Sequence, residues 1–241
     1  MRYLGGKSRI AKQLSGVIDS IRHPGQLVWD AFCGGLSMSV ALRKKGPVWS
    51  TDACVPLISL YQAVQAGWSV KTEVPREAYA AAKSLPDSDP MKAFCGFGCS
   101  FSGKWFGGYA APFPTDRTPH GAALRALKRD CAAGRFEVLD FLSVQPQPCE
   151  AILYLDPPYA GTTGYDGAPP FDAARFIQRV RDWSRWTHVF VSEYAFPIGE
   201  CVWASECRTT AGGKSGHGSA VERLFYVGPT TALTSNLDGP R

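Results

Sequence analysis

The chain has 241 residues, of which 45% are hydrophobic and 20% are charged, a composition typical of a globular protein with a sizeable core. No apolar run approaches the roughly 20 residues that a membrane-spanning helix needs, and the basic start of the chain lacks the apolar segment of a signal peptide. We therefore expect a cytoplasmic protein of one domain, or of one domain with an inserted lobe. The net charge of +5 allows a polyanionic partner but does not identify one.

The eight cysteines are scattered along the chain, and none of them belongs to a CxxC pair. No pair of histidines completes the spacing of a zinc site. In a chain without an export signal, such cysteines are interpreted as reduced thiols, several of them in the core. We therefore expect no metal ion.

Strand-like and helix-like segments alternate in the first part of the chain. A short apolar run ends in Asp30 and leads into a turn that contains Gly34 and Gly35, and a second apolar run ends in Asp52. This order is typical of the start of a parallel sheet with helical crossovers. We expect strands over residues 27–30 and 48–52, and helices over 37–43 and 55–66.

The alternation is lost between residues 75 and 134. Residues 97–109 are dense in glycine and aromatic side chains, and a basic helical stretch follows at 122–133. We interpret this region as an insertion that reaches out from the sheet. The predicted main domain then comprises residues 1–74 and 135–241, with 75–134 as the inserted region.

The second part of the chain returns to alternating elements. We expect strands over residues 136–140, 151–155 and 188–194, a helix over 173–186, and two terminal strands over 201–208 and 221–227. Asp172 is a candidate N-cap for the helix. The terminal pair predicts a β-hairpin, so the expected fold is a mostly parallel α/β sheet with an antiparallel C-terminal edge.

The motif Asp156-Pro157-Pro158-Tyr159 directly follows the predicted strand over residues 151–155. Asp156 can accept a hydrogen bond from an amino group, and the prolines fix the chain without competing N–H donors. Tyr159 offers a flat face for stacking. Together these groups suit a planar heterocycle with an exocyclic amine, such as adenine or cytosine. A proline-terminated strand with a turn aspartate is the alternative interpretation.

Acidic residues close several of the predicted strands. Asp30, Asp52, Asp140 and Asp156 all stand where ligands bind in open α/β sheets, and Gly34 lets a ligand approach the backbone. The spacing of a nicotinamide-binding glycine motif is absent, so a nucleoside site is favoured over a nicotinamide site. The alternative is that each acid only caps the element after it.

Four segments in order carry a family resemblance: Arg2-Tyr3-Leu4-Gly5-Gly6-Lys7, Asp30-Ala31-Phe32-Cys33-Gly34-Gly35, Asp52, and Asp156-Pro157-Pro158-Tyr159. The set resembles the Dam-type DNA adenine-N6 methyltransferases, which use S-adenosylmethionine, and especially the compact members found in phages and prophages. The resemblance implies a Rossmann-like class I methyltransferase fold.

The resemblance also implies roles for individual residues. Lys7 and its neighbours match the motif that holds the methionine part of the cofactor, and Asp52 matches the acid that binds the ribose. The implied cofactor-binding residues are Tyr3, Gly6, Lys7, Asp30, Phe32, Gly34, Asp52, Asp140 and Asp156, and the implied catalytic residues are Asp156, Pro157 and Tyr159. Two positions depart from the family pattern: Ala31 replaces its usual proline, and Leu36 its second glycine.

The inserted region falls where the family keeps its DNA-recognition segment. Lysines and arginines there are candidates for phosphate contacts, with ordinary solvated surface as the alternative. Trp105 is a candidate base wedge or a core residue of the insertion. The proposed DNA-binding residues are Lys104, Trp105, Arg117, Arg125, Lys128, Arg129 and Lys214.

The predicted function is methylation of a flipped adenine in double-stranded DNA, in the cytoplasm of a bacterium or of a phage-infected cell. One alternative is a DNA cytosine-N4 methyltransferase, which uses similar chemistry. Another is a non-catalytic nucleic-acid-binding protein on a decayed methyltransferase fold. The sequence leaves open the oligomeric state, the recognition site and the biological role, whether self-protection, restriction avoidance or regulation.

Overall fold

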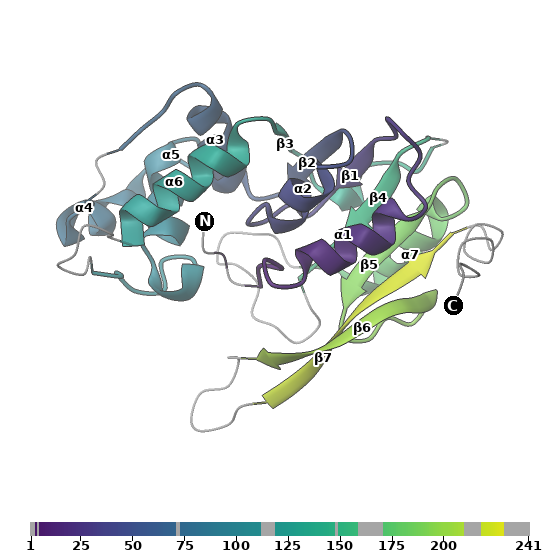
Figure 1. Ribbon diagram of the computed structural model, residues 1–241. Coiled ribbons are helices and arrows are strands. Elements are labelled where there is room, and N and C mark those ends of the chain that lie inside the picture. Colours follow the sequence, from purple (N-terminus) through teal and green to yellow (C-terminus); the bar gives the residue numbers. More distant parts are fainter. Residues whose placement is uncertain are drawn as a thin grey trace.

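The computed structural model describes residue 3 and residues 5–70, 73–111, 119–147, 149–158, 171–209 and 218–228. These residues form a mixed α/β structure in which one sheet lies beside a helical lobe (Figure 1).

The sheet has seven strands in the order β3-β2-β1-β4-β5-β7-β6. Their bounds are β1 (Val28–Asp30), β2 (Val48–Asp52), β3 (Arg135–Val138), β4 (Ile152–Leu155), β5 (Val189–Glu193), β6 (Glu200–Thr209) and β7 (Gly218–Val227). The first five strands pair in parallel, whereas β7 is antiparallel to β5 and β6 is antiparallel to β7. The strand order reverses between β1 and β4, as in a Rossmann-like sheet. The predicted fold class, including the antiparallel hairpin at the edge, is confirmed.

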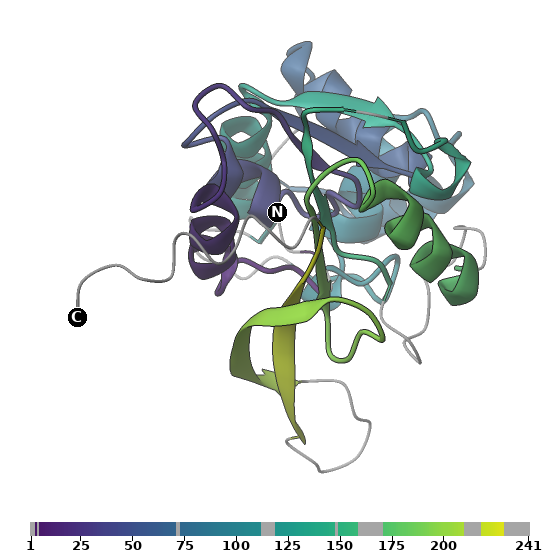
Figure 2. The same ribbon diagram turned by 90° about the vertical axis from the view of Figure 1, so that its right-hand side faces the viewer.

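Helices cover both faces of the sheet. Their bounds are α1 (Ala11–Asp19), α2 (Ser37–Leu42), α3 (Val55–Gln65), α4 (Arg76–Ala81), α5 (Pro90–Ala93), α6 (Pro119–Cys131) and α7 (Ala173–Trp183). Successive strand residues face opposite sides, so Val28 packs in the cluster with α1 and α2, whereas Trp29 packs in the cluster with α7. Figure 2 shows α1 and α7 on opposite sides of the sheet.

The helix α1 was not predicted from the sequence. Its buried positions include Leu14 and Ile18, four residues apart, so its apolar stripe has helical spacing. The glycines and basic residues just before it obscure the helical pattern. The helix matters for the site because the turn that leads into it carries Lys7.

The helical lobe consists of α4, α5, the π-helical turn η2 (Phe94–Gly98) and α6. Phe94 and Phe97 of this lobe share one buried cluster with Leu57 and Tyr61 of α3. The lobe is therefore packed onto the sheet domain through α3. The domain boundaries at residues 74 and 135 stay a prediction.

The hairpin of β6 and β7 extends beyond the other strands and projects from the body (Figures 1 and 2). The pairing of β7 with β5 ends where Arg223 faces Glu193, while its pairing with β6 continues as far as Gly218. Glu222 is thus the first residue of β7 beyond the end of β5. This register places its side chain at the edge of the sheet where the parallel strands finish.

Candidate active site

Three of the four acidic residues predicted at strand ends lie at one edge of the sheet. Asp30 ends β1, Asp52 ends β2, and Asp156 directly follows β4. Asp30 pairs in register with Tyr154, which packs on the face covered by α1 and α2. Side chains two positions apart on a strand share a face, so Asp156 emerges on that same side.

Lys7 reaches this edge from the turn that leads into α1. Its carbonyl accepts hydrogen bonds from the backbone N–H groups of Ile10 and Ala11. Its Nζ lies 2.9 Å from Asp156 Oδ1 and 2.9 Å from Glu222 Oε1. Burial disfavours the charged form of Lys7, but the two carboxylates outweigh it and raise the pKa above 10.5. Lys7 is therefore a buried, charged residue held between two acids.

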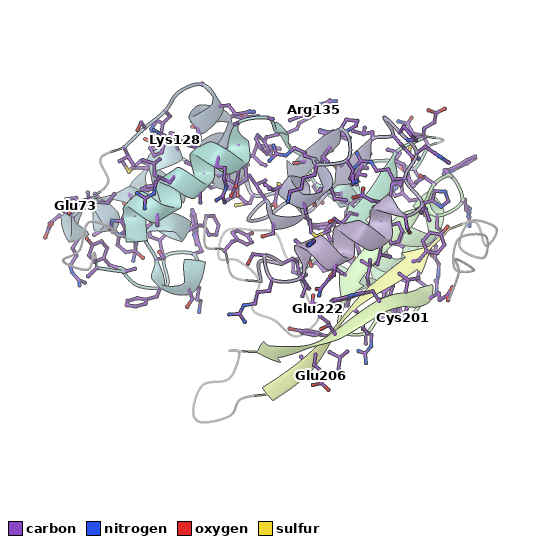
Figure 3. The ribbon with its side chains drawn as sticks, viewed as in Figure 1. Glu73, Lys128, Arg135, Cys201, Glu206 and Glu222 are labelled. Atoms are coloured by element: carbon purple, nitrogen blue, oxygen red, sulfur yellow. The ribbon has the colours of Figure 1, made fainter. Side chains whose placement is uncertain are left out.

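Glu222 was not predicted as a site residue. It is buried on β7, and Ser192 Oγ of β5 donates a hydrogen bond to its Oε1 over 3.4 Å. Leu224 and Tyr226 follow at two-residue intervals and pack in the core. A glutamate at an inward position of an otherwise apolar pattern was the signal available in the sequence. Figure 3 shows Glu222 at the base of the projecting hairpin.

The glycine turn after β1 is held by Asp52. Asp52 Oδ2 accepts from the N–H of Gly34 at 3.0 Å, and Oδ1 accepts from the N–H of Cys54 at 2.9 Å. Burial raises the pKa of Asp52, and these two backbone hydrogen bonds oppose the rise. A Cβ on Gly34, whose φ is +41°, would lie 2.9 Å from the ring of Tyr3. Tyr3, a predicted cofactor-binding residue, therefore packs directly on the glycine turn.

Leu36 is one of the two positions at which the sequence departs from the pattern of the family it resembles. It adopts left-handed backbone angles, with φ of 64° and ψ of 11°, just before α2. Its side chain is buried in the cluster that includes α3. A non-glycine residue in this conformation costs about 1–2 kcal/mol. The substitution therefore keeps the glycine-like turn, and burial of the leucine side chain offsets the strain.

Asp30 is the most deeply buried of the acids. Its Oδ2 accepts from Ser39 Oγ at 2.5 Å, and Ser39 Oγ in turn accepts from Ser50 Oγ at 2.8 Å. No donor among the described residues reaches the buried Oδ1. Burial, reinforced by the negative charges of Asp156 and Asp52, raises the pKa of Asp30 to about 7. The carboxylate therefore has an acceptor atom and a charge that suit a cationic donor.

We call Lys7, Asp30, Asp52, Asp156 and Glu222 the strand-end cluster. It combines one basic side chain with four acidic ones, so its net charge is negative when the acids are ionised. A buried cluster of this kind is stabilised by a cation that brings its own hydrogen-bond donors. The negative charge of this cluster and the glycine turn beside it suit a cationic nucleoside derivative such as S-adenosylmethionine.

The other predicted site residues have various surroundings. Phe32 packs against the rings of Phe141 and Phe176, at centroid distances of 5.8 and 5.9 Å. Asp140 caps the short turn after β3, because its Oδ1 accepts from the N–H of Leu142 at 3.0 Å. Pro157 is buried next to Asp156. Gly6 forms a turn with Tyr3, and the predicted stacking residue Tyr159 lies outside the described residues.

The predicted DNA-binding residues lie mainly on the helical lobe and outside the strand-end cluster. Lys104, Arg125, Lys128 and Arg129 are exposed, and Figure 3 shows Lys128 on α6, well separated from Glu222. Arg117 and Lys214 lie outside the described residues.

Trp105 packs inside the helical lobe. Its ring centroid lies 4.7 Å from that of Phe97 and 4.8 Å from that of Phe106. A Cβ added to Gly96 would come within 2.4 Å of the indole, so this glycine makes room for it. These contacts favour the core interpretation of Trp105 over the base wedge. Phe101 on the same loop is 63% exposed, and it was not singled out from the sequence.

Two negative findings apply to the described part of the chain. No helix there is both long and apolar enough to cross a bilayer. No group of three or more histidine, cysteine, aspartate or glutamate side chains in these residues is arranged so that it could hold a metal ion.

Comparisons with known proteins bear on the family. Residues 3–94, less than half of the chain, match the model of the D12 class N6 adenine-specific DNA methyltransferases. A search of curated proteins found no significant match.

Two solved structures cover most of the chain at low similarity. The rRNA methyltransferase aviRa from Streptomyces viridochromogenes is 12% identical, with a TM-score of 0.40, and the alignment covers 91% of this chain and 84% of that one. HI0767 from Haemophilus influenzae, a provisionally assigned methylase, is 12% identical with a TM-score of 0.37, and the alignment covers 92% and 89%. Scores this low carry no argument about activity.

The matched residues include Tyr3, Lys7, the glycine turn and Asp52, which the structure brings together at the sheet edge. Over residues 3–94, the resemblance to the N6 adenine-specific DNA methyltransferases that the sequence motifs indicated is confirmed, on a Rossmann-like fold.

Proposed function

We propose that this protein transfers a methyl group from S-adenosylmethionine to the N6 amine of adenine in duplex DNA. The observation that carries the proposal is the position of Asp156. Its carboxylate lies at the end of β4, beside the buried acids of the cofactor side, and pairs with Lys7 at 2.9 Å. The family match over residues 3–94 supports methyl transfer as the class of reaction.

Asp156 and Pro157 would activate the target amine. The lone pair of an adenine amine is delocalised into the ring, so the amine is a poor nucleophile. Hydrogen bonds from this amine to the Asp156 carboxylate and the Pro157 carbonyl favour a more tetrahedral nitrogen with its lone pair directed at the methyl group. Positioning of this kind can lower a barrier by up to about 7–11 kcal/mol in ideal cases.

On the cofactor side, we propose that Asp30 accepts a hydrogen bond from the amino group and that Asp52 meets the ribose hydroxyls. Each Asp52 oxygen already accepts from one backbone N–H, and a carboxylate oxygen can accept a second donor. S-adenosylmethionine, when bound, supplies an electrophilic methyl group on a positively charged sulfur. The net negative charge of the strand-end cluster would stabilise this positive sulfur.

The target base must leave the duplex to reach Asp156. Tyr159 is proposed to stack on the flipped base, replacing lost stacking at about 1–3 kcal/mol. The exposed lysines and arginines of the helical lobe are proposed to contact DNA phosphates. These roles rest on the family resemblance and on residue chemistry.

The test incubates the purified protein with duplex DNA and S-adenosylmethionine that carries a labelled methyl group, then digests the DNA to nucleosides. We expect N6-methyladenine from the wild type and none from Asp156→Ala. Asp182→Ala is the matched control, because Asp182 lies on α7 and pairs with Gln178.

Wild-type-like methylation by Asp156→Ala would refute the mechanism. Label in N4-methylcytosine would redirect the proposal to the cytosine amine, which the same groups can hold. A protein that binds DNA but shows no heat of binding with S-adenosylmethionine in calorimetry would instead be a non-catalytic nucleic-acid-binding protein.

A further inference from the structure

The resemblance assigns Lys7 to the cofactor, but in the structure Lys7 contacts two acids of the protein. Asp156 comes from the end of β4 and Glu222 from β7, and each lies 2.9 Å from the ammonium nitrogen. Both contacts are largely screened from solvent, since the side chain of Lys7 is only 8% exposed. Glu222 therefore shares the ammonium with the residue proposed to bind the target amine.

Burial of the Glu222 carboxylate at this position carries a desolvation penalty. The next inward positions of β7 are Leu224 and Tyr226, which pack in the apolar core. A buried carboxylate loses its hydration, and the attraction of its ion pair offsets only part of that cost. An apolar residue at this position would therefore give at least the same free energy of unfolding. Charged groups retained under such conditions concentrate at functional sites.

The surroundings of Glu222 restrict its orientation. Ser192 Oγ donates to the same Oε1 that receives Lys7, and Ser192 belongs to β5, which pairs with β7. The ammonium of Lys7 is therefore held from two directions, by a side chain of the hairpin and by Asp156. The contact with Glu222 therefore limits rotation of the flexible lysine side chain about the Asp156 carboxylate.

We propose that Glu222 is a positioning residue for methyl transfer, which holds the Lys7 ammonium against Asp156 and so fixes the carboxylate that receives the target amine. This inference rests on the proposed function of Asp156.

The charge of Glu222 gives the proposal a distinctive signature in the pH profile. Lys7 and Ser192 contact Glu222 directly, and Lys7 also contacts Asp156. Asp30 of β1, Asp52 of β2 and Tyr154 of β4 are the titratable groups that interact electrostatically with these acids or with one another. Removing one negative charge from this set makes ionisation of the remaining acids easier. The acid limb of the kcat profile should therefore move to lower pH when Glu222 is neutralised, and to higher pH when Lys7 is neutralised.

The experiment compares Glu222→Gln, Glu222→Ala and Lys7→Gln with the wild type in the methylation assay across pH. Glu206→Gln is the matched control, because Glu206 is an exposed glutamate on the same hairpin (Figure 3). We expect Glu222→Ala to lower kcat by about 10- to 100-fold, the effect of a catalytic group displaced by about 1 Å. KM values for DNA and S-adenosylmethionine should change by less than about threefold, since the proposed loss is in the transition state.

Glu222→Gln keeps an oxygen that can accept from Lys7, so it should restore part of kcat while still shifting the acid limb to lower pH. This conservative variant also covers the case in which Glu222→Ala does not fold. Glu206→Gln should have the kcat of the wild type and an acid limb at the same pH.

An unchanged kcat in Glu222→Ala, or an acid limb that stays in place in both Glu222 variants, would overturn the proposal. A wild type that does not methylate DNA refutes the proposed function, and the positioning role falls with it. In that case a double-mutant cycle of unfolding free energies for Lys7 and Glu222 still reports whether the ion pair couples the two residues.

Discussion

The strand-end cluster and the helical lobe bury different kinds of side chain. At the sheet edge, the buried ammonium of Lys7 lies 2.9 Å from each of two carboxylates, those of Asp156 and Glu222. The interior of the lobe is mainly aromatic and aliphatic, and its basic residues face solvent. Substitutions in the cluster should therefore change charge balance and catalysis, whereas those in the lobe should change packing or DNA affinity. Tyr3 connects the regions, because its ring lies 5.1 Å from that of Phe97.

The largest effect is expected for Lys7→Met, which leaves the buried Glu222 and the partly buried Asp156 without their shared cation. Breaking a buried ion pair in this way costs about 3–5 kcal/mol of unfolding free energy. Activity should fall by more than about 100-fold, because Asp156 loses its fixed position. Urea denaturation and the methylation assay measure both effects. Lys12→Met, at an exposed position of α1, is the control, and equal stability of the two variants would contradict the prediction.

A comparable loss of stability, with different consequences for activity, is expected for Phe97→Ala in the helical lobe. Removing this buried ring should cost about 3–5 kcal/mol. The cavity also removes the support of Tyr3 on the glycine turn, so we expect weaker binding of S-adenosylmethionine. Phe101→Ala removes a ring that is 63% exposed and should change stability by less than about 0.5 kcal/mol. Similar melting curves for the two variants would show that the lobe does not pack as described.

An effect of intermediate size is expected from Asp30, whose ionisation should make the affinity for S-adenosylmethionine depend on pH. Its pKa rises from 3.8 in the unfolded chain to about 7 in the folded protein. Protonated Asp30 therefore contributes fully to the free energy of unfolding below about pH 4, and this contribution is lost as the pH rises through 7. A cationic ligand prefers the ionised carboxylate, so its affinity should increase with pH up to 7, by at most about tenfold per unit. Calorimetry with S-adenosylmethionine at several pH values tests this. Asp30→Asn should abolish the pH dependence of this affinity. If the dependence persists in Asp30→Asn, another group causes it.

The smallest effects are expected from the exposed basic residues of α6. Arg125→Ala, Lys128→Ala and Arg129→Ala should each weaken DNA binding a few-fold and lower the salt slope by about one unit if they contact phosphates. Their kcat should stay at the wild-type value, because Lys128 lies far from Glu222 (Figure 3). Salt titrations of DNA affinity provide the measurement. Unchanged affinity in all three would identify this face as ordinary solvated surface.

Much of the fold could be predicted because its elements carry local signals. The apolar runs before Asp30, Asp52 and Asp156 were recognised as strands, and the terminal hairpin was recognised as an antiparallel edge. The helix α1 was missed because glycines and basic residues surround its short apolar stripe. The packing of the inserted region onto α3 was not foreseen either, since such contacts join distant parts of the chain.

The sequence alone determined which residues we propose to supply the chemistry: the acids at the strand ends, the glycine turn, and the motif that begins at Asp156. These are short-range patterns in which neighbouring residues set both the backbone and its ligand-binding groups. Only the tertiary structure decided which of them meet. It pairs Lys7, near the start of the chain, with Glu222 near its end, because the strand order and the register of β7 bring both to one edge of the sheet. It also shows that Leu36 can keep a glycine-like turn, because the core buries its side chain.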